Sequence, residues 1–107
     1  MSLFNAGQLN ADTVKTETLT GTRTITAAEI RQYKVWVLDP GGGSQDVNLP
    51  VASADFNGEC ILVENTADAA ESLAIKDTAT VITIAQNGSG FIYCRNGTWR
   101  GLSGASV

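Results

Sequence analysis

The acidic side chains are the first candidates for chemistry, because a pair of carboxyl groups can cleave a glycosidic bond, one as acid and the other as nucleophile or base. The candidates for such a pair are Asp46, Asp55, Glu59 and Glu64. Nothing in their spacing brings any two of them together, and the chain has no histidine, which removes the usual general base. We therefore predict that the protein is not an enzyme and that these carboxylates lie on solvated strand faces and in turns.

A run of three glycines, Gly41 to Gly43, raises the alternative of a phosphate-binding loop. Such a loop needs glycines at set intervals, a helix that begins at the phosphate and, in the P-loop, a lysine followed by serine or threonine. Here the run lies in "VLDPGGGSQDVNLP", residues 37–50, which leads into a strand-like segment and carries Asp39 and Asp46, whose charges repel anions. The run is predicted to be a mobile surface turn between two strands.

Cys60 and Cys94 lie in apolar runs without the CxxC spacing of zinc and redox sites. Two states are open for them: free thiols in the core, which we favour because cytosolic thiols normally stay reduced, or a disulfide. A nucleophilic role would need a nearby base or a positive field, and neither is indicated. Asp68 and Asp77 do not have the spacing of an EF-hand. We predict no metal and no cofactor.

The charge balance and the hydropathy limit the partners. The formal net charge is −4, and the seven Lys and Arg residues are scattered rather than clustered as phosphate-backbone binding requires. No apolar run approaches the roughly 20 residues of a membrane span, and the start "MSLFNAGQLN" lacks the basic segment and apolar core of a signal peptide. We therefore predict a soluble protein made in the cytoplasm, with neither nucleic acid nor a membrane as partner.

The apolar residues recur mostly with a period of two, which is typical of half-buried β-strands. Turn residues interrupt this pattern about every ten residues, so about seven or eight short strands are expected. Their segments are 13–20, 22–26, 34–39, 45–50, 58–65, 72–77, 80–88 and 90–99. Many short strands with almost no helix predict an all-β fold, an antiparallel β-sandwich or barrel of jelly-roll-like kind. Residues 13–107 are expected to form this single domain, preceded by a flexible N-terminal arm of residues 1–12.

One short helix is predicted in "TAAEIRQY", residues 26–33. Thr26 followed three residues later by Glu29 is a capping box, in which each side chain accepts a hydrogen bond from an amide left unpaired at the helix start. One or two turns of helix are marginal alone, so Ile30 and Tyr33 are expected to pack on a sheet.

The pair Asn96-Gly97 stands between the strand-like segments "FIYC" and "TW". Both central residues of a type I′ turn need positive φ, a conformation that Asn and Gly adopt readily. The pair therefore predicts that the last two strands form a β-hairpin.

Trp36 and Trp99 are the aromatic residues most able to serve a function, since an exposed ring can anchor a protein contact whereas a buried ring fills the core. Trp36, between two valines, is expected in the core or at a subunit interface. Trp99, beside Arg100 and close to the hairpin turn, is open between the core and an interface. Both are our candidates for a subunit interface.

Three segments together resemble a small β-domain of tailed-phage structural proteins: "TLTGTRTITAAEIRQYKVWVLDPGGGSQDVNLP", "GECILVENTADAAESLAIKD" and "ITIAQNGSGFIYCRNGTWR". The shared features are a strand ending in a step like "VNLP", a strand ending in Asn in "VEN", a valine- and isoleucine-rich strand, and a closing hairpin like "NGTW". The resemblance covers roughly residues 17 to 100. It implies a virion structural protein, either a capsid decoration protein or a module of a tail or head fibre, and usually a homotrimer.

A decoration (cement) protein on the outside of the phage head is the favoured interpretation, because the chain begins at its own methionine and lacks the heptads and long repeats of a fibre shaft. It would be made in the host bacterial cytoplasm and bind the major capsid protein. The arm is polar except for Leu3, Phe4 and Leu9, which suits a segment that becomes ordered on the shell with these residues as anchors. The alternative is a trimeric fibre module that binds a host surface glycan or receptor.

Overall fold

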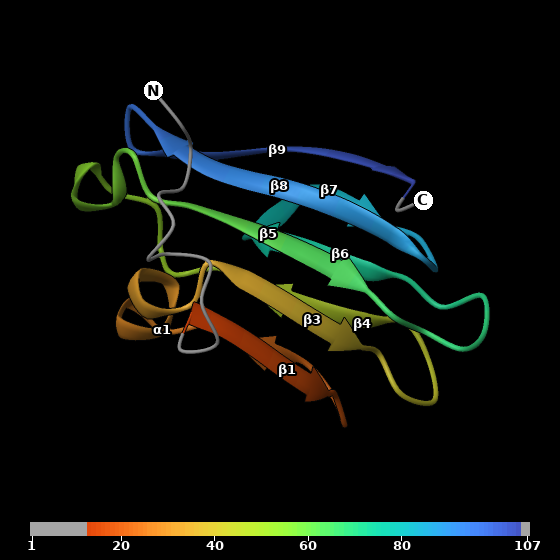
Figure 1. The fold of residues 1–107 in the computed structure, drawn as a ribbon. Coiled ribbons are helices and arrows are strands. Elements are labelled where there is room, and N and C mark those ends of the chain that lie inside the picture. The colour runs from red at the N-terminus through yellow and green to blue at the C-terminus, as the bar shows by residue number, and fades with distance from the viewer. Residues whose placement is uncertain (1–12, 106–107) are drawn as a thin grey trace.

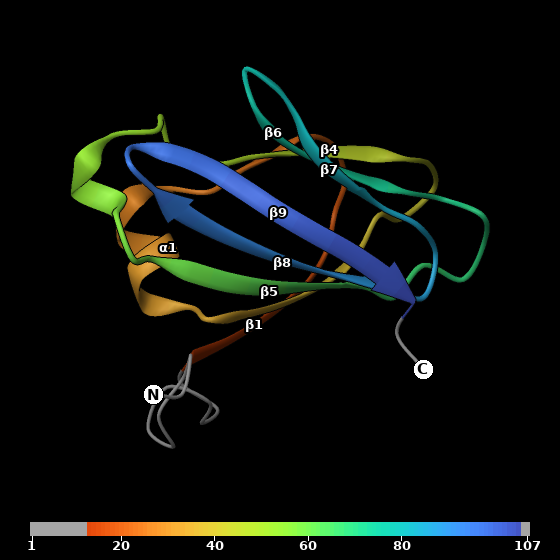
Figure 2. The same cartoon turned by 90° about the horizontal axis from the view of Figure 1, so that it is seen from above.

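The computed structural model describes residues 13–105, which form two β-sheets and one short α-helix. Sheet A has the strand order β1-β3-β5-β8-β9, and sheet B has the order β2-β4-β6-β7. Figure 1 shows sheet A in front of sheet B, and Figure 2 shows the sheets as two layers. The elements are β1 (Val14–Thr18), β2 (Arg23–Thr24), α1 (Ala27–Gln32), β3 (Val35–Asp39), β4 (Gln45–Asn48), the 3-10 helix η3 (Ala54–Phe56), β5 (Cys60–Asn65), β6 (Leu73–Asp77), β7 (Ala79–Ile84), β8 (Gly88–Arg95) and β9 (Thr98–Ala105).

The chain alternates between the two sheets from β1 to β6, so that neighbours within a sheet run in the same direction. β1, β3 and β5 are parallel in sheet A, and β2, β4 and β6 are parallel in sheet B. A parallel pair needs a crossover connection, and here a strand of the opposite sheet supplies each crossover. The prediction of an all-β fold is confirmed, but that of antiparallel pairing is wrong for these strands.

The antiparallel pairs are β6 with β7, β5 with β8, and β8 with β9. The predicted hairpin is confirmed, because β8 and β9 pair across Asn96 and Gly97, whose φ angles are 53° and 68°. Both sheets have open edges, β1 and β9 in sheet A and β2 and β7 in sheet B. The fold is therefore two mixed sheets and not a closed barrel.

The hydrophobic core lies between the sheets and is built from alternate residues of the strands. Trp36 and Leu38 face inward from β3, and Ile61 and Val63 do so from β5, all four fully buried. Burying an aliphatic or aromatic side chain of this size contributes about 1.5–3 kcal/mol relative to leaving it exposed. The core is thus the main reason that the two sheets stay together.

Helix α1 follows the predicted capping box. The Thr26 hydroxyl accepts from the backbone N–H of Glu29, and the Glu29 carboxylate accepts from the backbone N–H of Thr26. Ile30 is fully buried, and the Tyr33 ring meets the Trp36 ring edge-on at 5.7 Å. The helix therefore packs on the end of the core, as expected for so short a helix.

The triple glycine joins β3 to β4 as a turn. Gly41 has a φ of +83°, and its N–H donates to the carboxylate of Asp39 at 2.9 Å. A side chain at Gly41 would lie 2.5 Å from the carbonyl oxygen of Leu19. Glycine is thus required at position 41, because φ is positive and the Leu19 carbonyl leaves no room for a side chain. The run leads into β4, whereas a phosphate site would need a helix to begin there.

Candidate functional site

The two tryptophans predicted at a subunit interface are buried in the core of the single chain. Trp36 is 0% exposed and Trp99 is 4% exposed. Their indole N–H groups donate to backbone carbonyls, Trp36 to Tyr33 at 3.1 Å and Trp99 to Pro50 at 2.8 Å. Neither ring is available to a second subunit, because the alternation along β3 and β9 turns both toward the opposite sheet. The interface assignment is corrected to a core assignment for both residues.

The predicted anchors Leu3, Phe4 and Leu9 lie outside the described residues, and their role stays a prediction. Among the carboxylates, Asp46 pairs with Lys76 at 3.3 Å. Glu59 pairs with Lys34 at 2.9 Å. Glu64 lies on β5 of sheet A and Asp46 on β4 of sheet B. The two carboxylates belong to different layers and are therefore not side by side, as a catalytic pair would be.

The cysteines lie on neighbouring strands but face opposite sides of sheet A. Cys60 is directly opposite Tyr93, and the next residue, Cys94, points into the core. Both are free thiols, and burial raises the pKa of each thiol above its usual range. Cys94 is buried as expected, whereas Cys60 is half-buried, and neither has the lowered pKa of a nucleophile.

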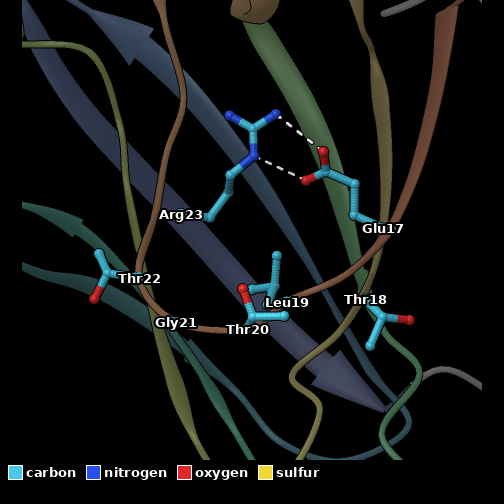
Figure 3. Close-up of a pocket in the computed structure, with 7 residues that line it drawn as sticks. All are labelled: Glu17, Thr18, Leu19, Thr20, Gly21, Thr22 and Arg23. Carbon is cyan, nitrogen blue, oxygen red and sulfur yellow. Dashed lines mark hydrogen bonds and ion pairs between the residues drawn. The ribbon is translucent and has the colours of Figure 1, made fainter.

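A network of charged side chains lies on the side of the molecule where β1 and β2 are the edge strands, and Figure 3 shows the part of it that Arg23 and Glu17 form. The Arg23 guanidinium donates to the carboxylates of Glu17, at 2.8 and 3.2 Å, and of Glu29, at 2.9 and 2.7 Å. It also lies over the Trp36 ring at 5.3 Å.

The hydrogen bonds from Arg23 lower the pKa of Glu29 to about 2 and also lower the pKa of Glu17. Residues Glu17 to Arg23 line a hollow at this edge. Its charged groups already satisfy one another, so the network is structural. Inward-pointing charges at edge strands protect those strands from pairing with other chains.

The outer face of sheet A, which points away from the core, has a continuous line of apolar side chains. We call it the apolar row, and it is set by the pairing of all five strands. Its members are Val14, Val35, Leu62, Phe91 and Leu102. Leu102 is 68% exposed, and the Phe91 ring stacks on the Tyr93 ring at 5.6 Å. Tyr93 thus widens the apolar surface beyond the row.

The outer face of sheet B is polar at the corresponding positions. One of its cross-strand lines contains Thr24, Asn48 and Lys76, and the other contains Asp46, Ala74 and Thr83. A contiguous apolar patch on an otherwise polar surface marks an interaction site more reliably than scattered apolar residues. The outer face of sheet A is therefore the candidate functional site.

Sequence reasoning did not find this surface. The signal was present in β3 and β8, where "VWV" and "FIY" are apolar at consecutive positions and hence on both faces of the strand. Leu62, Phe91 and Leu102 are separated by many residues, however, and only the strand order of sheet A brings them side by side.

Comparisons with known protein families, with curated proteins and with solved structures find no match. Within residues 13–105, no helix has the length and apolarity to cross a membrane. In the same residues, no three His, Cys, Asp or Glu side chains are grouped so as to hold a metal ion.

Proposed function

We propose that the chain is a structural protein of a tailed-phage virion, a decoration protein that binds the outside of the head and stabilises it. The proposal of a virion structural protein rests on the resemblance of residues 17 to 100 to phage β-domains. The observation that carries a binding function is the apolar row on sheet A, because a contiguous line of half-buried apolar side chains that ends in the exposed Leu102 favours a protein contact. The two facing sheets are further taken as a β-sandwich, the architecture expected of such domains.

The proposed mechanism is cementing through the N-terminal arm. Leu3, Phe4 and Leu9 would occupy a groove of the major capsid protein, while the β-domain stays outside the shell. Several arms in one assembly act together, because binding of the first raises the effective concentration of the others. The net charge of −4 keeps free subunits apart until they reach the head.

Co-sedimentation with heads tests this proposal. Expanded heads of the phage that encodes the chain, prepared without it, are mixed with the full chain or with a variant in which Gly and Ser replace residues 1–9 at equal length. We expect the full chain to sediment with the heads and the variant to stay in solution. Unchanged sedimentation of the variant would refute the role of the arm, and failure of the full chain to bind would refute decoration.

A fibre module that binds a host glycan is the second candidate, and one feature favours it. The stacked Phe91 and Tyr93 rings are half-buried on the outer face of sheet A, where a sugar ring could stack on them. A glycan array separates the two functions, because a decoration protein has no reason to retain any glycan. Specific retention that is lost in Tyr93→Ala would favour the fibre module.

A further inference from the structure

The charged residues around the apolar row are arranged with an internal symmetry. Glu64 lies two residues beyond Leu62 on β5, and Arg100 lies two residues before Leu102 on β9. Phe91 lies on β8, directly between Leu62 of β5 and Leu102 of β9. Glu64 and Arg100 are therefore its diagonal neighbours, on opposite sides and displaced in opposite directions along the strands. Each diagonal is roughly 8 Å long.

Within residues 13–105, neither of these charges has an ion-pair partner. Glu64 and Arg100 are both exposed. By contrast, the carboxylates of Glu17, Glu29 and Glu59 are each paired with a cation. A free anion and a free cation at equal distances on either side of an aromatic ring form a self-complementary pattern.

We propose that a second copy of this chain docks on the outer face of sheet A through a two-fold contact centred on Phe91. A two-fold axis through Phe91, in the plane of the interface and perpendicular to the line from Glu64 to Arg100, exchanges these two residues. Each Glu64 then faces Arg100 of the other copy, and the two Phe91 rings meet at the axis. The apolar rows of the two copies then cross at Phe91 at a steep angle, because each row runs straight across the strands whereas the line from Glu64 to Arg100 is a diagonal, and the contact is isologous.

The small area of the face indicates that the contact is weak. Five strands about 4.8 Å apart, each contributing about five residues of roughly 3.3 Å, give a face on the order of 400 Å² per copy. Standard stable interfaces bury about 800 Å² per partner. The copies therefore exchange, and the dimer population rises with concentration. The proposed dimer concerns the free chain and uses the same face as the proposed contact with the head, so a weak, exchanging dimer would release this face for the head.

Sedimentation velocity of the full chain, from about 10 µM to about 1 mM, is the first test, because small interfaces associate only at high concentration. We expect a concentration-dependent shift from 11.2 kDa to twice that mass. A monomer throughout would overturn the proposal, and so would a trimer, because a three-fold assembly cannot be built on a two-fold contact alone.

Point variants locate the contact. Leu102→Lys places a charge in the apolar row and is expected to abolish the shift, while circular dichroism shows the fold retained because the position is exposed. Val51→Lys is the matched control, since Val51 is the other exposed large apolar residue of the 13–105 segment, 83% exposed, and lies between β4 and η3. Equal effects of the two variants would overturn the assignment to sheet A. Loss of head binding in Leu102→Lys, with no dimer in the unaltered chain, would assign the face to the shell instead.

A charge swap tests the two-fold geometry itself. Glu64→Arg and Arg100→Glu each place like charges opposite one another at two symmetric points, and each is expected to weaken dimerisation about tenfold or more. The double variant exchanges the two charges and is expected to restore it. Single variants that weaken the dimer without rescue in the double variant would contradict the pairing of Glu64 with Arg100.

Discussion

One buried side chain, that of Asn65, holds the end of β5 in place through hydrogen bonds, and we expect its removal to lower the stability of the fold. Asn65 is 1% exposed, and its amide makes three hydrogen bonds to the backbone. Nδ2 donates to the carbonyls of Glu71, at 2.9 Å, and of Ile84, at 3.0 Å. Oδ1 accepts from the N–H of Ala67 at 2.9 Å. Asn65 thus holds the connection between β5 and β6 against the end of β7.

Asn65→Ala removes all three partners at once. Each hydrogen bond contributes about 1 kcal/mol net, and the groups left behind are buried, so we expect the free energy of unfolding to fall by about 3 kcal/mol. Domains of this size are stable by only about 5–15 kcal/mol, so the loss is large. Urea unfolding followed by tryptophan fluorescence measures it. Asn48→Ala is the matched control, because Asn48 also ends a strand but makes no side-chain hydrogen bond within residues 13–105.

Asn65→Asp refines the test without changing the volume. The carboxylate keeps the acceptor for Ala67 but turns an oxygen toward the carbonyls of Glu71 and Ile84. The charged form is disfavoured in the folded chain, which raises the pKa of the new carboxyl. We therefore expect this variant to gain stability, relative to the unaltered chain, as pH falls toward 4.

A loss of stability below about 1 kcal/mol in Asn65→Ala, equal to that in Asn48→Ala, would refute the role of the three Asn65 hydrogen bonds.

Two further predictions concern the edge network and the glycine turn. Because hydrogen bonds from Arg23 lower the pKa of Glu29 from 4.5 to about 2, their contribution to stability is complete above pH 4.5 and is lost as pH falls toward 2. The urea midpoint should fall as pH falls over this range, and Arg23→Met should make this dependence of the midpoint on pH weaker. The same dependence in the variant and in the unaltered chain would contradict the role of the network. Gly41→Ala should cost at least about 2 kcal/mol, because the residue has positive φ and no room for a side chain. Gly42→Ala has open space and should change the urea midpoint little, whereas equal midpoints for the two variants would contradict the account.

Local chemistry in the sequence predicts the local structure well. The capping box of Thr26 and Glu29 is present, and the turn at Asn96-Gly97 forms the hairpin. Each of these signals acts within a few residues, so neighbouring side chains and backbone angles decide it.

The pairing of distant strands is not visible in the sequence. Val35 and Leu62 are partners in a parallel pair, yet a period of two is the same for parallel and antiparallel strands. For the same reason the inward direction of Trp36 and Trp99 was open, since alternation does not say which face is buried. The candidate surface depends on five strands at once, so it could be recognised only after their order was known.

Imaging tests the proposed decoration of a phage head most directly. Heads of the phage proposed to encode this chain, prepared without it, are reconstructed by cryo-electron microscopy before and after addition of the purified chain. The account predicts added density for a two-sheet β-domain on the outside of the shell, at symmetry-related positions, with an arm reaching the major capsid protein. Unchanged heads, or density confined to the tail fibres, would contradict it.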